Sequence, residues 1–114
     1  MRGQSRIVFR AVFRIKVSDR ATGELVGYVG DISERGLRVL SDTPAVAGTT
    51  IQWRLRMRRD DGFQSVDIDG HCLWSRQNAR SGQRESGIRV DQPNEAFVQL
   101  VESLRARRKA KQPA

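Results

Sequence analysis

Two arginines and a short acidic run are the residues of this sequence whose types and spacing could bind a ligand. Arg6 and Arg10 are four residues apart, and 20 residues separate Arg10 from the run Asp31-Ile-Ser33-Glu-Arg-Gly36. A guanidinium presents a planar fork of donors that can bind phosphate oxygens or the O6/N7 edge of guanine, and it can stack on a purine. A carboxylate such as Asp31 can accept hydrogen bonds from N1–H and the exocyclic amine of guanine.

Ser33 and Gly36 complete this set. A serine hydroxyl can donate or accept a hydrogen bond, and a glycine permits either a positive φ or a close approach of the backbone. Each part alone is weak evidence, because an Arg-rich chain produces such pairs by chance and Asp-x-Ser-x-x-Gly is common in ordinary turns. The combination fits a ligand that carries both phosphates and guanines.

A second Arg-x-x-x-Arg pair, Arg10 and Arg14, overlaps the first. Only 16 residues separate Arg14 from Asp31, and Arg14 already falls in an alternating strand pattern. Arg6 and Arg10 are therefore the preferred pair, and Arg14 is the alternative to Arg6. Arg2 is a secondary candidate, because the small residue Ser5 beside Arg6 leaves room for a second ligand molecule.

The elements that must position these residues are predicted mainly by alternation of apolar and polar side chains, which is typical of strands with one buried face. The predicted strands cover 11–18, 24–30, 36–41, 50–58, 66–74 and 87–90, with turns at 19–23 and 60–62. An apolar stripe from Phe97 to Leu104, preceded by the capping residue Asn94, predicts a helix. The fold class is therefore mainly β, a small antiparallel six-stranded β-barrel with one C-terminal α-helix.

The chain divides into three predicted parts: a flexible basic N-terminal arm over residues 1–10, the barrel with its closing helix over 11–106, and a basic disordered tail over 107–114. Within the barrel, Trp53, Cys72 and Trp74 are expected on buried strand faces. Gly70 is expected at a bulge or a close backbone contact.

Composition narrows the class of function. The chain has 114 residues and a formal net charge of +8, which favours anionic ligands. Its apolar stretches are far shorter than a membrane span, so neither membrane insertion nor a secretory signal is expected. The single Cys72 suits a reducing, cytoplasmic setting. The sequence offers no nucleophile–base pair, paired carboxylates or metal cluster, so no enzyme activity, catalytic residue, metal or cofactor is expected.

The two motifs at this spacing resemble the signature of PilZ domains, which are bacterial receptors for the second messenger cyclic di-GMP. Cys72-Leu-Trp74 and Gly87-Ile-Arg-Val90 look like two late-strand landmarks of that family. The resemblance implies that Arg6 and Arg10 bind the ligand phosphates and stack on guanine. It also implies that Asp31 and Ser33 read a guanine edge and that Gly36 shapes the turn.

The function that this resemblance implies is a non-enzymatic cyclic di-GMP effector in signal transduction. Its arm would close over the dinucleotide and change which downstream protein docks, for example in motility, exopolysaccharide or biofilm control. One alternative is a nucleic-acid-binding barrel, disfavoured because Phe13 and Trp53 lie on the predicted core side. Another is a PilZ-like interaction module that binds no nucleotide, disfavoured by the intact motifs. The sequence leaves open whether one ligand or an intercalated pair binds.

Overall fold

A computed structural model describes residues 7–8, 15–42, 45–59, 62–80 and 82–111 of the chain, which form seven strands and one helix. The elements are β1 (Ile7–Val8), β2 (Ile15–Asp19), β3 (Leu25–Ser33), β4 (Gly36–Ser41), β5 (Thr50–Arg59), β6 (Gly62–Gln77), β7 (Arg84–Val90) and α1 (Glu95–Lys111).

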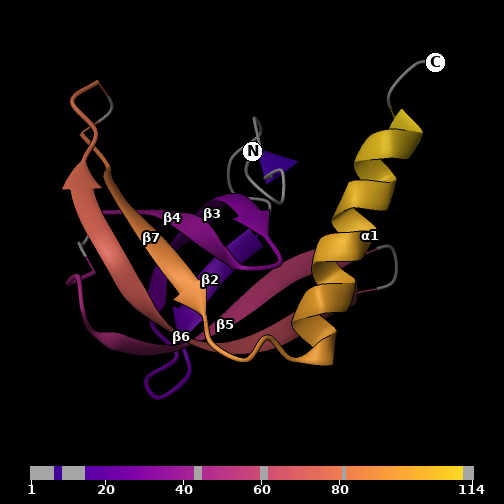
Figure 1. Ribbon diagram of the computed structural model, residues 1–114, viewed down its shortest axis with the longest axis horizontal. Coiled ribbons are helices and arrows are strands. Elements are labelled where there is room, and N and C mark those ends of the chain that lie inside the picture. Colours follow the sequence, from indigo (N-terminus) through magenta and orange to yellow (C-terminus); the bar gives the residue numbers. More distant parts are fainter. Residues whose placement is uncertain (1–6, 9–14, 43–44, 60–61, 81, 112–114) are drawn as a thin grey trace.

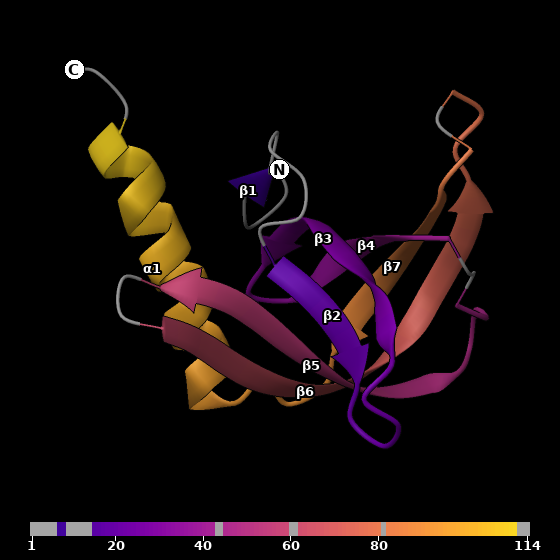
Figure 2. The ribbon, with the colours of Figure 1, turned by 180° about the vertical axis from the view of Figure 1, so that it is seen from behind.

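Six of these strands close into a barrel. They pair antiparallel in the order β3-β2-β5-β6-β7-β4, and a further pairing of β3 with β4 joins the two ends (Figure 1). The helix α1 stands beside the hairpin of β5 and β6 in both views (Figures 1 and 2). The predicted six-stranded antiparallel barrel with one C-terminal helix is confirmed.

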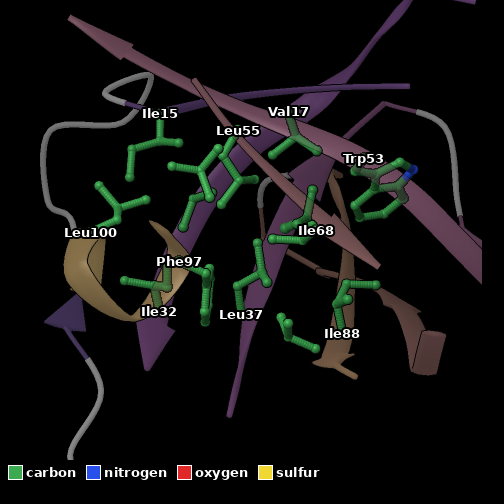
Figure 3. Packing of buried hydrophobic residues seen from close by; sticks show 14 of the residues in the cluster. Ile15, Val17, Ile32, Leu37, Trp53, Leu55, Ile68, Ile88, Phe97 and Leu100 are labelled. Atoms are coloured by element: carbon green, nitrogen blue, oxygen red, sulfur yellow. The ribbon is translucent and has the colours of Figure 1, made fainter. Parts of the chain in front are cut away.

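The strand β5 shows why the sequence forms this barrel. Ile51, Trp53, Leu55 and Met57 are buried, whereas the residues between them are exposed. This period of two sends apolar side chains from the six barrel strands into one interior, where residues of α1 join them in a single core (Figure 3). Trp53 is a core residue, as predicted.

The helix α1 begins as expected at an asparagine cap. The Asn94 Oδ1 atom accepts a hydrogen bond from the backbone N–H of Phe97 at 2.8 Å, and its Nδ2 atom donates to the carbonyl of Asp67 at 2.8 Å. The helical backbone continues past the boundary predicted at residue 107 and ends at Lys111. Ala, Arg and Lys all have high helix propensity, which accounts for the extension. The helix is not long and apolar enough to span a membrane.

The prediction that Trp74 shares the buried face of β6 with Cys72 is wrong. Cys72 pairs with Ile88, but Trp74 pairs with Gly87, so a bulge at Leu73 shifts the register by one residue. A one-residue shift moves every later side chain to the opposite face. Trp74 therefore lies half-buried on the outer surface of the barrel.

Gly70 is not at that bulge. A side chain on Gly70 would overlap the backbone carbonyl of Arg89, so this glycine has the other role expected for it, a close backbone contact.

Candidate ligand-binding site

The Asp-x-Ser-x-x-Gly run forms the tight hairpin between β3 and β4. Ser33 pairs with Gly36, so Glu34 and Arg35 make a two-residue turn. The Ser33 hydroxyl oxygen accepts a hydrogen bond from the backbone N–H of Arg35 at 3.3 Å, and the Arg35 carbonyl accepts one from Val90 at 2.9 Å. One hydrogen bond within the turn and one from the end of β7 therefore stabilise it.

Gly36 is required for a close approach of two strands. Its φ is not positive, but a Cβ at this position would overlap the carbonyl oxygen of Ile88 on β7. Of the two roles expected for this glycine, the structure shows the close backbone approach.

A bulge at Gly30 positions Asp31. The register between β3 and β4 shifts between Val29 and Asp31, after which Asp31 pairs with Arg38. Asp31 is only 6% exposed, although its neighbour Ile32 is the residue that enters the core. The Arg38 Nε atom donates a hydrogen bond to the Asp31 Oδ2 atom at 2.7 Å.

An alternating row of charges continues from Asp31 across the outer surface. The Arg38 Nη1 atom lies 3.5 Å from the Glu85 Oε2 atom, and the Glu85 Oε1 atom lies 3.3 Å from the Arg76 Nη2 atom. Asn78 donates a further hydrogen bond to Glu85 at 2.8 Å, and this bond is the main cause that lowers the pKa of the Glu85 carboxyl. Two acidic and two basic side chains from four strands therefore form one connected network.

Trp74 borders this network. A Cβ on Gly87 would overlap the indole of Trp74, so the ring lies over the bare backbone of that glycine. The Arg76 guanidinium carbon is 5.0 Å from the centroid of the Trp74 ring. Because Gly87 pairs with both Trp74 and Arg38, and Arg38 pairs with Asp31, these residues form one cross-strand row.

The short strand β1 extends the row on its other side. Ile7 pairs with Ile32, and Val8 pairs with Asp31. These two residues belong to the segment expected to be a flexible arm, and they are the part of that segment that the structure describes. The four arginines predicted for the arm and its flank, Arg2, Arg6, Arg10 and Arg14, lie outside the described residues.

Arg38 was not among the predicted site residues, and Trp74 was predicted on the wrong face of β6. Arg38 could have been found, because a two-residue turn at Glu34 and Arg35 sets the residue opposite Asp31. The outward position of Trp74 could not have been predicted, because nothing in the alternating pattern marks the bulge that moves its side chain outward.

Glu34, in the turn between β3 and β4, forms an ion pair with Arg105 of α1. The Arg105 Nη2 and Nε atoms lie 2.8 Å and 3.2 Å from the two carboxylate oxygens of Glu34. These hydrogen bonds are the main cause that lowers the pKa of the Glu34 carboxyl. A bidentate pair of this kind constrains the orientation of both side chains.

Replacing Glu34 with glutamine is expected to destabilise the protein at neutral pH by up to about 1 kcal/mol, and by less in acid. A carboxyl whose pKa is lowered by folding stabilises the folded state above its unfolded pKa of about 4.3, and this contribution is lost as the pH falls through the folded value. Urea unfolding of both proteins at about pH 7 and about pH 3 measures this. A difference in stability that is the same at both pH values would contradict the assigned pair.

Cys72 and His71 do not point to a second site. Cys72 is 1% exposed, and burial raises the pKa of its thiol. His71 lies between Asp91 and Arg89, with a nitrogen–oxygen distance of 2.9 Å to the former. Within the described part of the chain, no group of three or more His, Cys, Asp or Glu residues could hold a metal ion.

A family model for the PilZ domain matches residues 2–106, which is nearly the whole chain. The chain belongs to the PilZ domain family. No curated protein sequence matches it. The matched residues include the whole barrel, α1 as far as residue 106 and the N-terminal segment from Arg2 onward.

Solved structures share the fold at low sequence identity. The inhibitor of motility MotI/DgrA from Bacillus subtilis is 12% identical with a TM-score of 0.76, covering 99% of this chain and 55% of that one. This PilZ domain therefore spans about half the length of that relative. The PilZ domain of YcgR from Escherichia coli, solved with c-di-GMP, is 14% identical with a TM-score of 0.62, covering 96% of each chain.

The PlzA protein of Borreliella burgdorferi, also solved with c-di-GMP, is 11% identical with a TM-score of 0.56. That match covers 96% of this chain and 53% of PlzA.

Proposed function

We propose that this PilZ domain is a non-enzymatic receptor for cyclic di-GMP and that it regulates a downstream protein. The observation that carries the proposal is the pairing of β1 with β3. Ile7 and Val8, which lie between Arg6 and Arg10 in the sequence, pair directly with Ile32 and Asp31. The two residues between the arginines of the first motif therefore lie beside the first two residues of the second motif, which supports a shared site.

In this proposal, Arg6 and Arg10 bind the phosphates of the ligand and stack on its guanines. Asp31 and Ser33 read a guanine edge, and Gly36 keeps the turn close to β7. The structures of YcgR and PlzA, both solved with c-di-GMP, support the choice of ligand. The YcgR structure is of the PilZ domain itself.

The register also favours Arg6 over Arg14 as the partner of Arg10. Arg14 directly precedes β2, whose first pair with β3 is Lys16 with Tyr28. That pair lies three residues from Asp31 along β3, whereas β1 pairs at Asp31 itself. Arg2 stays a secondary candidate.

Regulation would follow from closure of the N-terminal arm over the dinucleotide. Neutralised phosphates and a newly ordered arm would present a different surface to a partner protein, which is a common form of ligand switch. The proposal includes a bacterial setting, which the family resemblance implied, and a cytoplasmic one, which the single Cys72 favoured. The proposal includes no cofactor, membrane anchor or nucleic-acid partner.

Titration calorimetry with cyclic di-GMP, GTP and single-stranded DNA tests the proposal. The Arg10→Ala and Asp31→Ala variants are each expected to weaken cyclic di-GMP binding by about tenfold to a hundredfold, because each loses hydrogen bonds to a charged group. Asp67→Ala is the matched control, since Asp67 also pairs with an arginine on the outer surface, at 2.7 Å from Arg54. It should leave binding unchanged.

Absence of cyclic di-GMP binding by the native protein would refute the proposal. A DNA affinity that falls steeply with salt would instead favour a nucleic-acid-binding barrel. One observation supports that second candidate: Phe63 on β6 is 61% exposed, with the Arg56 guanidinium 4.2 Å above its ring. The number of ligands per protein in the same titration distinguishes a single dinucleotide from an intercalated pair.

A further inference from the structure

Arg38 donates a hydrogen bond to Asp31 at 2.7 Å, and neither motif includes it. We propose that Arg38 is a positioning residue that orients the Asp31 carboxylate toward the guanine edge and gives the site its selectivity for guanine. This inference rests on the proposed function, because it concerns the same site.

The backbone brings the two side chains together. Arg38 is directly opposite Asp31 across the β3–β4 pair, and its Nε atom is 2.7 Å from the Asp31 Oδ2 atom. Gly30 leaves space for the guanidinium, since a Cβ at Gly30 would lie 3.1 Å from the Arg38 Cζ atom. The bulge at Gly30 therefore turns Asp31 outward and also leaves space for the side chain that binds it.

A second carboxylate fixes the other end of the guanidinium. The Arg38 Nη1 atom lies 3.5 Å from the Glu85 Oε2 atom, and Glu85 is itself held by Asn78 and Arg76. The planar guanidinium presents its donors in fixed directions toward the two carboxylates, whereas the flexible ammonium of a lysine would constrain their orientation less. The orientation of Asp31 is thus coupled to a network that extends to β6.

Charge gives the second reason. Only 9% of the Asp31 side chain is exposed, and a bound purine would cover this remaining surface. A neutral guanine donates hydrogen bonds but supplies no counter-charge, and a buried carboxylate without one is costly. Arg38 supplies that charge from the protein side.

The hydrogen bond from Arg38 is compatible with recognition of a base by Asp31. An ionised carboxylate has about four acceptor positions on its two oxygens, and the Arg38 Nε atom occupies one of them. The N1–H and the exocyclic amine of guanine need two. Adenine presents no such pair of donors, so an oriented Asp31 distinguishes cyclic di-GMP from cyclic di-AMP, which has the same sugars and phosphates.

The test is the ratio of the dissociation constants for cyclic di-AMP and cyclic di-GMP, measured by calorimetry on the full chain. Arg38→Met should lower this ratio by about fivefold or more, as expected for loss of one bidentate base contact, and Arg38→Lys should lower it by less. Arg54→Met is the matched control. Its Nε atom also lies 2.7 Å from an aspartate, but on β5 and β6, so the ratio should not change.

A double-mutant cycle separates positioning from a general structural role. In an Asp31→Asn background, Arg38→Met should produce no further loss of selectivity, because Arg38 acts through Asp31. Thermal unfolding of each variant reports stability independently, and Arg38→Lys serves if Arg38→Met does not fold.

A ratio unchanged in both Arg38 variants, with native binding intact, would overturn this inference and leave the proposed function standing. So would an equal loss of selectivity with and without Asp31. A native protein that does not bind cyclic di-GMP would overturn both.

Discussion

Replacement of Phe97 with alanine is expected to lower the free energy of unfolding by about 3–5 kcal/mol, the usual cost of deleting a large buried aromatic side chain. Phe97 lies in the first turn of α1 and is 0% exposed. It packs in the same core as strand residues such as Ile15 and Ile32 (Figure 3). Alanine would leave a cavity where the helix meets the barrel, and close-packed neighbours could fill it only in part.

Denaturant unfolding of the two proteins measures this loss. Phe63→Ala is the matched control, because Phe63 is 61% exposed and its loss should cost less than about 1 kcal/mol, mostly from the contact with Arg56. Equal effects of the two substitutions would show that α1 does not contribute to the barrel core. The slope with denaturant should stay unchanged if both variants unfold in the same two-state manner.

Gly36→Ala is the second substitution with a large expected effect, a loss of about 3 kcal/mol. Its Cβ would overlap the carbonyl oxygen of Ile88, a backbone atom that cannot rotate away as a side chain would. The pair between β4 and β7 would have to separate at the turn that contains the candidate site. Affinity for cyclic di-GMP should fall together with stability.

Thermal unfolding of Gly36→Ala and Gly82→Ala separates steric overlap from backbone strain. Gly82 has a φ of 76° and nothing within 4 Å of a Cβ, so its replacement should cost only about 1 kcal/mol of left-handed strain. A Gly36→Ala variant as stable as Gly82→Ala would mean that β4 and β7 are not in close contact at this point.

The barrel could be predicted from the sequence because its strands alternate so regularly. In β5, four buried apolar residues alternate with exposed polar ones, and this pattern leaves only one face for the core. The range of β4 was predicted without error, since Gly36 and Ser41 bound a short apolar alternation. The helix was predicted by its apolar stripe and the asparagine cap.

Bulges account for what could not be predicted. The irregularities at Gly30 and Leu73 depend on how neighbouring strands pair. A glycine within a strand is compatible with a bulge but also with a close backbone contact, as at Gly70, and no residue preference marks the bulge at Leu73. The bulge at Gly30 turns Asp31 to the outer surface, and the bulge at Leu73 does the same for Trp74. A sequence shows the motif residues of the candidate site, but the surface around them depends on strand register.

The two-residue strand β1 has a consequence for the entropy of ligand binding. β1 pairs with β3 at Ile7 and Val8, and β2 begins at Ile15, so the sequence from 9 to 14, which includes Arg10, connects two segments that are both paired with β3. The conformational entropy of bringing those two segments together is lost during folding, before a ligand binds. A dinucleotide that binds Arg10 would therefore lose less free energy to ordering the chain than it would with an untethered arm, and its affinity should be correspondingly higher.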